Sequence, residues 1–121
     1  MIAWFEIPVA DMERAKKFYE TIFDITVKVN NLGGFIMGLL PDKPRMGQAN
    51  GALVQHEHYR PSLTDGVLVY FGCEDVALVL EKVEQAGGSI LQPKTDIGAG
   101  HGFMGMLQDS EGNRIALHSN A

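Results

Sequence analysis

Hydrophobic and polar residues follow one pattern twice along this chain. A short apolar strand leads into an amphipathic helix, and three further strands follow. The first copy opens at 2–19 with IAWFEIPVADMERAKKFY, and a weaker copy opens at 66–83 with GVLVYFGCEDVALVLEKV. Two copies of one strand–helix unit predict two modules of the same fold. The space between two such modules is where we expect function.

The first module, about residues 1–56, should contain one helix and four strands. Asp11 suits the N-cap of the helix, because its carboxylate can accept an otherwise unpaired amide of the first turn. The helix should end near Asp24. The strands are expected at 2–9, 25–30, 35–40 and 51–56, with a polar loop at 41–50.

The first strand should present two different faces, because side chains alternate across a strand. The wholly apolar face should pack against the helix, and it carries Phe5, Ile7 and Val9. The opposite face is mixed and suits a cavity or an interface; it carries Ile2, Trp4 and Glu6.

After a connector at 57–65, the pattern restarts in a second module, about residues 66–121. Asp75 should cap the second helix, which should end at Ala86-Gly87-Gly88. Strands are expected at 67–73, 89–94, 103–109 and 114–119, with a glycine-rich loop at 96–102. An offset of 64 residues aligns the two caps and places Trp4 and Glu6 on Leu68 and Tyr70.

Composition narrows the class of protein. A length of 121 residues fits one compact domain or two very small ones, and the formal charge of −5 argues against a nucleic-acid partner. Cys73 is the single cysteine, so an internal disulfide cannot form and a reducing compartment is expected. No apolar run suits a membrane span and no signal peptide is evident. We therefore expect a cytoplasmic protein without a membrane partner.

Three motifs accompany the double βαβββ pattern: FEIPVxDxxRAxxFY, KVEQAGG and DSEGNRIAL. In this order and spacing they resemble the vicinal oxygen chelate superfamily, the group of glyoxalase I, extradiol dioxygenases and bleomycin-resistance proteins. Within it the chain is most similar to the glyoxalase-like branch related to lactoylglutathione lyase. The resemblance implies a single α+β domain over 1–121, in which two βαβββ modules pair as an incomplete barrel around a cavity.

The resemblance also implies where a metal would bind in metal-dependent members. One ligand comes from the first and one from the last strand of each module. Here those positions hold Trp4, Leu53 or Val54, Leu68 and Ala116. None of these side chains offers the oxygen, imidazole or thiolate that a divalent cation needs. We therefore expect no metal, no cofactor and neither glyoxalase I nor dioxygenase activity. Only Gln55 or His56, in a shifted register, could restore one ligand.

Several residues are candidates for a ligand site, each with a structural alternative. Trp4 could stack on a planar or apolar ligand, or fill a core or a dimer interface. Glu6 in an apolar pocket could act as a general base, or form a salt bridge with Arg114. Tyr70 could offer its hydroxyl to a ligand, or be buried against backbone.

The last strand should place Arg114, Ala116 and His118 on one face. Arg114 could bind a carboxylate and His118 could shuttle protons, or both could lie at a solvated strand end. His101 lies in the glycine-rich loop, which could form a lid. A metal at His56-Glu57-His58 lacks a third ligand. Cys73 should be an inert core thiol.

Three functions fit these observations. The first is metal-independent binding of a small, partly apolar molecule by a homodimer whose cavity is lined by Trp4, Glu6, Leu68, Tyr70, Arg114 and His101. The second is a lyase or isomerase with Glu6 or a histidine as general base. The third is a dimer without a cavity that acts in regulation or assembly.

Overall fold

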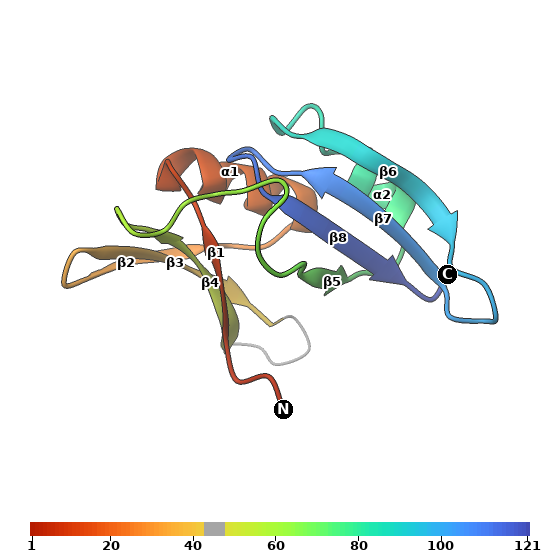
Figure 1. Cartoon of the computed structure of the whole chain (residues 1–121), viewed down its shortest axis with the longest axis horizontal. Helices are drawn as coiled ribbons and strands as arrows, with labels where there is room; N and C mark the ends of the chain where they lie inside the picture. The colour runs from red at the N-terminus through yellow and green to blue at the C-terminus, as the bar shows by residue number, and fades with distance from the viewer. Residues whose placement is uncertain (43–47) are drawn as a thin grey trace. The chain divides into compact units, whose positions relative to one another are not determined.

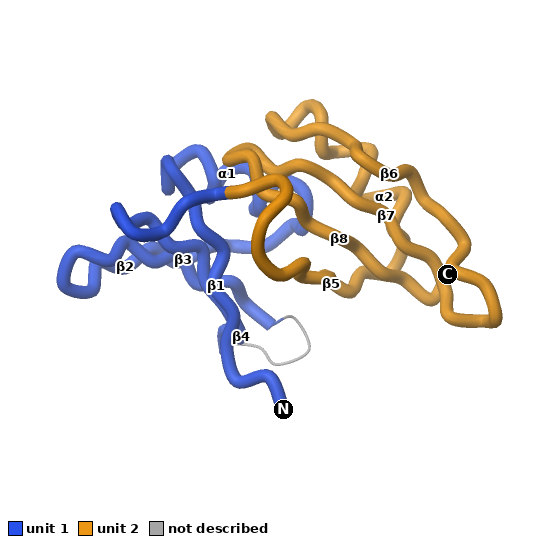
Figure 2. The backbone as a smooth tube through the Cα atoms, viewed as in Figure 1, with its two compact units in different colours: residues 1–61 blue, residues 62–121 orange. Residues whose placement is uncertain are grey.

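The computed structural model describes residues 1–42 and 48–121. The chain forms two compact units, Met1–Pro61 and Ser62–Ala121, which divide within the expected connector (Figure 2). Each unit contains a strand, a helix and three more strands in that order. The fold is therefore α+β with two similar βαβββ modules, and each module forms an open sheet.

Unit 1 contains a four-stranded sheet with α1 on one face (Figure 1). The strands lie side by side in the order β1-β4-β3-β2, and only β1 and β4 are parallel neighbours. The elements are β1 Phe5–Pro8, α1 Met12–Phe23, β2 Lys28–Leu32, β3 Phe35–Pro41 and β4 Ala49–Gln55.

Helix α1 has the expected bounds and the expected buried stripe. Asp11 caps it by accepting a hydrogen bond from the Arg14 amide at 3.1 Å. Asp24 ends it in the left-handed conformation, with φ of 53°. The buried side chains recur at helical spacing and are Met12, Ala15, Phe18, Tyr19 and Ile22. This stripe forms the core of unit 1 with the face of the sheet that it covers.

Unit 2 repeats this arrangement, with strand order β5-β8-β7-β6 and β5 parallel to β8. Its elements are β5 Tyr70–Gly72, α2 Val76–Leu80, β6 Ser89–Asp96, β7 Phe103–Gln108 and β8 Arg114–Ser119. The side chains of α2 that are buried against the sheet are Val76, Val79 and Leu80.

The prediction for the second helix was wrong in length. The regular α-helix stops at Leu80. The turns that follow include hydrogen bonds that span three residues instead of four, such as Val83 N–H to Leu80 O at 3.1 Å. Val83 stays fully buried, so these turns continue the apolar stripe without α-helical geometry. Three branched valines in this short stretch lower its helix propensity. The expected stop is confirmed, because Gly87 takes a φ of 105°.

Strand bounds differ from the expected ones, because backbone pairing rather than apolar content decides where a strand begins and ends. The first strands of the two units are shorter than 2–9 and 67–73, since only Phe5–Pro8 and Tyr70–Gly72 pair with β4 and β8. The strand expected at 25–30 lies at Lys28–Leu32, and β6 extends to Asp96. Of the polar loop expected at 41–50, residues 43–47 lie outside the described residues.

In each unit, one glycine of the sheet lets the helix-covered side pack closely against it. A Cβ at Gly38 would lie 2.8 Å from Val27 Cγ1 and 2.9 Å from the Met12 sulfur. A Cβ at Gly105 would lie 2.8 Å from Val76 Cγ1 and 2.9 Å from Leu80 Cδ1. They occupy equivalent positions, because Gly38 pairs with Leu53 and Gly105 pairs with Leu117.

Neither described helix has the length and apolar character that crossing a membrane would require.

Candidate functional site

The register of unit 1 decides which residues lie on the sheet face opposite α1, called here the open face. Parallel pairing sets Ile7 against Leu53 and Pro8 against Val54. Paired residues point to the same face, so Leu53 shares the helix-covered face with Ile7, and Val54 lies on the open face with Trp4 and Glu6. Of the two residues left open by the sequence, only Val54 lies on the open face, but neither is the equivalent of Ala116. Glu6 pairs with Ala52 as Tyr70 pairs with Ala116, so the prediction is corrected, and Ala52 stands at the position equivalent to a metal ligand.

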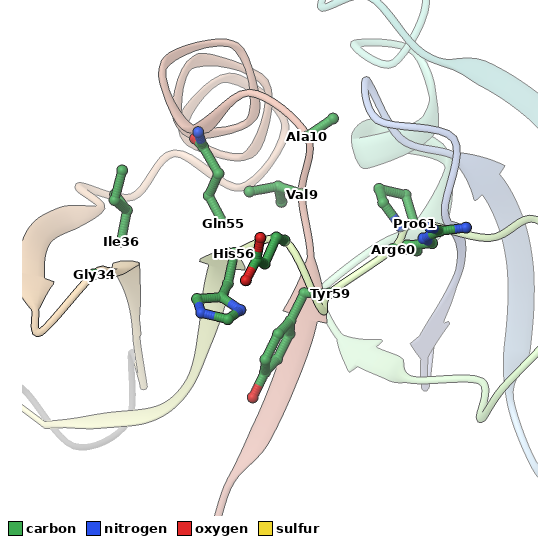
Figure 3. Close-up of a pocket in the computed structure, with 10 residues that line it drawn as sticks. Val9, Ala10, Gly34, Ile36, Gln55, His56, Tyr59, Arg60 and Pro61 are labelled. Atoms are coloured by element: carbon green, nitrogen blue, oxygen red, sulfur yellow. The ribbon is translucent and has the colours of Figure 1, made fainter.

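Gln55 is excluded from the open face by its own hydrogen bond. Its Oε1 atom accepts from the Met12 backbone amide at 2.7 Å, on the side of the sheet that α1 covers. Figure 3 shows the Gln55 side chain directed toward α1, whereas the rings of His56 and Tyr59 point the other way. His56 is therefore the next open-face residue after Val54.

The side chains at the four implied ligand positions do not fit a divalent metal. The side chains of Ala52, Leu68 and Ala116 are hydrocarbons, and the indole nitrogen of Trp4 can only donate a hydrogen bond. Within residues 1–42 and 48–121, no three His, Cys, Asp or Glu side chains gather closely enough to hold an ion. The donor set that the fold group uses for Lewis-acid chemistry is not provided by these residues.

Glu6 is held by two hydrogen-bond donors on the open face of unit 1. Trp4 Nε1 donates to its Oε2 atom at 3.3 Å, and the Tyr59 hydroxyl donates to its Oε1 atom at 2.7 Å. No lysine or arginine in the described part of unit 1 forms an ion pair with it. Arg114 belongs to the other unit, so its suggested pairing with Glu6 stays a prediction.

Tyr59 was missed by sequence reasoning, because it lies in the connector and no motif marks it. The hydrogen bond to Glu6 raises the pKa of Tyr59 above its ordinary value, with burial and the Glu6 charge adding to the effect. Tyr59 therefore stays a protonated donor at neutral pH. It orients the carboxylate from a segment 53 residues away in the chain.

An aromatic group adjoins this carboxylate. The ring of His56 stacks on Phe35, with centroids 4.0 Å apart and planes at 6°. Tyr59 lies edge-on to both rings, 6.0 Å from Phe35 and 6.1 Å from His56. We call Trp4, Glu6, Phe35, His56 and Tyr59 the Glu6 cluster.

The histidine pair in the connector is engaged in local contacts. The His58 backbone amide donates to His56 Nδ1 at 3.2 Å, and His58 Nε2 lies 3.5 Å from Glu57 Oε1. Because the Nδ1 lone pair accepts a hydrogen bond, only Nε2 of His56 remains as a possible ligand atom. This arrangement gives no support to a metal at His56-Glu57-His58.

A groove of about 630 Å³ adjoins the Glu6 cluster and shares His56 and Tyr59 with it (Figure 3). It lies at the ends of β1 and β4, where the chain enters α1 and the connector. Its other lining residues are Val9, Ala10, Gly34, Ile36, Gln55, Glu57, Arg60 and Pro61.

Unit 2 places several candidate residues on the equivalent open face. Tyr70 pairs with Ala116, and Met104 pairs with His118. The predicted common face of Arg114, Ala116 and His118 therefore follows from the register. Tyr70 is 52% exposed, so its predicted alternative as a buried tyrosine is wrong. Leu68 is half-buried beside the start of β5.

The His118 side chain forms a hydrogen bond with the glycine-rich loop, at the backbone of His101. Its Nε2 atom lies 2.8 Å from the His101 carbonyl oxygen, which can only accept, so Nε2 carries the proton. The His101 side chain is exposed. The lid function suggested for this loop stays a prediction.

Cys73 belongs to unit 2, and it is half-buried, so its predicted place in the core is wrong. Burial first, and then the charge of Asp75, raise the pKa of the Cys73 thiol. Its sulfur donates to the His118 carbonyl oxygen at 3.5 Å. A thiol with a raised pKa is a weak nucleophile, which agrees with the expected inert role.

Comparisons with known proteins agree on one family. The family model described as the Glyoxalase/Bleomycin resistance protein/Dioxygenase superfamily matches residues 1–117. A curated relative from Mycobacterium bovis, named "Putative glyoxylase CFP32", is 28% identical over 115 residues. That match covers 94% of this chain but 43% of the relative, so the chain spans less than half of the relative's length.

Solved structures share the fold at low identity. A glyoxylase/bleomycin resistance protein/dioxygenase domain from Frankia sp. EAN1pec has a TM-score of 0.70 and 20% identity, with 94% of this chain and 92% of that chain covered. Glyoxalase I from Zea mays has a TM-score of 0.71 and 18% identity, with 98% of this chain and 45% of that chain covered. The chain belongs to the Glyoxalase/Bleomycin resistance protein/Dioxygenase superfamily.

Proposed function

We propose that this protein binds a small, partly apolar molecule on the open face of unit 1 without a divalent metal. The observation that carries the proposal is the Glu6 carboxylate, held by Trp4 and Tyr59 on a face whose metal-ligand position in β4 is Ala52. An oriented polar group among aromatic side chains is typical of small-molecule sites.

The exposure of the aromatic side chains supports this proposal. Trp4 is 41% exposed and Phe35 is 37% exposed, so neither completes the core of unit 1. The predicted alternative of Trp4 as a core residue is therefore wrong. Both rings remain available to a ligand, as an aromatic contact surface beside a fixed carboxylate.

Trp4 makes the proposal directly testable, because it is the single tryptophan of the chain. Small molecules would be titrated into the protein with a chelator present, and Trp4 fluorescence would be recorded. We expect a saturable change that weakens in Glu6→Gln and Tyr59→Phe. If no compound in a diverse library changes Trp4 fluorescence, or if binding requires an added divalent metal, the proposal is wrong.

A second candidate function is a lyase or isomerase with Glu6 as general base. It is favoured by the exposure of Glu6 and by its remaining lone pairs, since an ionised carboxylate offers about four acceptor directions. Glu6→Gln separates the two functions. For an enzyme it should abolish turnover, whereas for a binding module it should change affinity only.

We also propose a homodimer in a reducing, cytoplasmic environment. Isolated apolar side chains are strongly exposed near the first strand of each unit, with Ile2 at 86% and Val67 at 91%. A second copy would cover such side chains. Light scattering coupled to size-exclusion chromatography tests this, and a monomer at all concentrations would exclude it.

A further inference from the structure

We propose that the Glu6 cluster recognises an organic cation, namely a protonated amine carried on an apolar body. This inference rests on the proposed binding function and names the class of its ligand. Three observations carry it: a carboxylate without a cationic partner among residues 1–42 and 48–61, the orientation of that carboxylate, and the exposed rings around it.

No cationic side chain among the described residues of unit 1 pairs with Glu6. Its two hydrogen bonds come from the uncharged donors of Trp4 and Tyr59. Arg60 is the cationic side chain of the adjoining groove, and it points away from the rings of His56 and Tyr59 (Figure 3). Glu57 adds a second acidic side chain to that groove. A cation would meet a favourable field here, and an anion an unfavourable one.

The geometry leaves Glu6 able to accept further hydrogen bonds. Each carboxylate oxygen receives one donor, at 2.7 Å for Oε1 and 3.3 Å for Oε2. The second lone pair of each oxygen is therefore left for a ligand N–H. Because Tyr59 and Trp4 fix the carboxylate, little side-chain freedom would be lost when an ammonium group binds.

The aromatic rings provide the second half of the recognition. Trp4 and Phe35 are exposed for 41% and 37% of their surface, and His56 holds the Phe35 ring by stacking on it. Exposed aromatic faces attract cations and also cover apolar groups. A ligand with an ammonium head and a hydrocarbon body uses both properties.

The test compares two probes that differ only in their polar group. Cyclohexylmethylammonium has the charge and the donors, and cyclohexylmethanol has the same body without charge. The readout is the indole N–H resonance of Trp4, which is a single peak in a ¹⁵N–¹H spectrum because the chain has one tryptophan. We expect the ammonium to bind about fivefold more tightly than the alcohol, as a surface charge contact allows.

Two matched variants assign that preference to the cluster. Glu6→Gln should remove the preference, whereas Glu13→Gln, which removes one exposed negative charge from α1 in the same unit and outside the groove, should keep it. In the unmodified protein, added salt should reduce the preference because exposed charges are screened. That last measurement needs no variant, so a misfolded Glu6→Gln protein does not prevent the test.

Several outcomes would overturn the inference. Equal affinity for the two probes would refute a cation site but leave the proposed binding function intact. The same holds if Glu13→Gln removes the preference as fully as Glu6→Gln, or if salt has no effect. If neither probe shifts the Trp4 resonance, an organic cation is refuted as the ligand class. The proposed binding function is refuted as well only if no compound of the library changes Trp4 fluorescence.

Discussion

The Tyr59 hydroxyl donates a 2.7 Å hydrogen bond to Glu6 Oε1, although the two residues are 53 positions apart in the chain. This bond joins the connector to the segment that opens the fold. It also presents the carboxylate on the sheet face that α1 does not cover. The proposed ligand chemistry of the protein depends on this contact.

The pH dependence of Tyr59 should report the bond to Glu6. The pKa of Tyr59 is raised in the folded state, first by this bond. Its contribution to stability is therefore present below the ordinary tyrosine pKa of about 10 and is lost as pH rises through the raised pKa. Glu6→Gln should move the pKa of Tyr59 back toward its ordinary value. Phenolate absorbance, with Tyr59→Phe as the subtraction control, measures this, and an unchanged titration in Glu6→Gln would refute it.

The two glycines beneath the helices should tolerate no methyl group. Gly38→Ala and Gly105→Ala each place a Cβ within 2.9 Å or less of helix-side atoms, so each should lower the free energy of unfolding by about 1–3 kcal/mol. Gly72→Ala is the control, because no atom lies within 4 Å of its added Cβ. Urea denaturation of the three variants checks this. Equal stability of Gly38→Ala and Gly72→Ala would contradict the packing described.

Asp75 should stabilise unit 2 in a pH-dependent way. It accepts from the Ala77 amide at 2.9 Å and pairs with Lys94 at 2.9 Å, and the bond to Lys94 is the main cause of its lowered pKa. Because the folded pKa lies below the unfolded one, this stability is present above the ordinary aspartate pKa and is lost as pH falls through the lowered value.

Replacing Asp75 should therefore matter at neutral pH and not in acid. Asp75→Ala should lower the free energy of unfolding at neutral pH, because it removes the N-cap of α2 and the partner of Lys94. Lys94→Met should keep the cap but reduce the pH dependence. Denaturation curves over an acid-to-neutral series measure both effects. A constant difference between Asp75→Ala and the parent at every pH would contradict this account.

Gln55 should be a structural residue rather than a ligand residue. Its Oε1 atom accepts from the Met12 amide at 2.7 Å, so Gln55→Met leaves an amide of the first helical turn without this acceptor. The variant should lose about 1 kcal/mol of stability and keep ligand binding. Exposed Gln85→Met is the matched control and should be near neutral. Lost binding in a folded Gln55→Met protein would contradict the assigned register.

The sequence predicted the modules well because apolar periodicity and caps are local signals. Asp11 and Asp24 mark the ends of α1 through their own backbone preferences, and the structure confirms both; Gly87 takes the expected positive φ, but at the end of the turns that follow α2. Whether Leu53 or Val54 lies on the open face depends on how β4 pairs with β1. The hydrophobic periodicity of a single strand does not reveal that pairing. The early end of α2 at Leu80 depends on how the following turns pack against the sheet.

The candidate site was only partly predictable. Trp4 and Glu6 were found because strand alternation separates them from the apolar face of β1. Phe35 and Tyr59 were not, because their roles arise from contacts between distant segments. No pattern near Tyr59 distinguishes it from an ordinary connector residue.

The central claim is that this protein binds a small molecule without a divalent metal. Elemental analysis combined with native mass spectrometry, on protein purified without a chelator or a metal-affinity tag, tests it most directly. The account predicts no stoichiometric divalent metal and a mass increment from a bound small molecule, reduced in Glu6→Gln. One tightly held divalent metal per chain would contradict this prediction, because the positions of Trp4, Ala52, Leu68 and Ala116 provide no ligand for it.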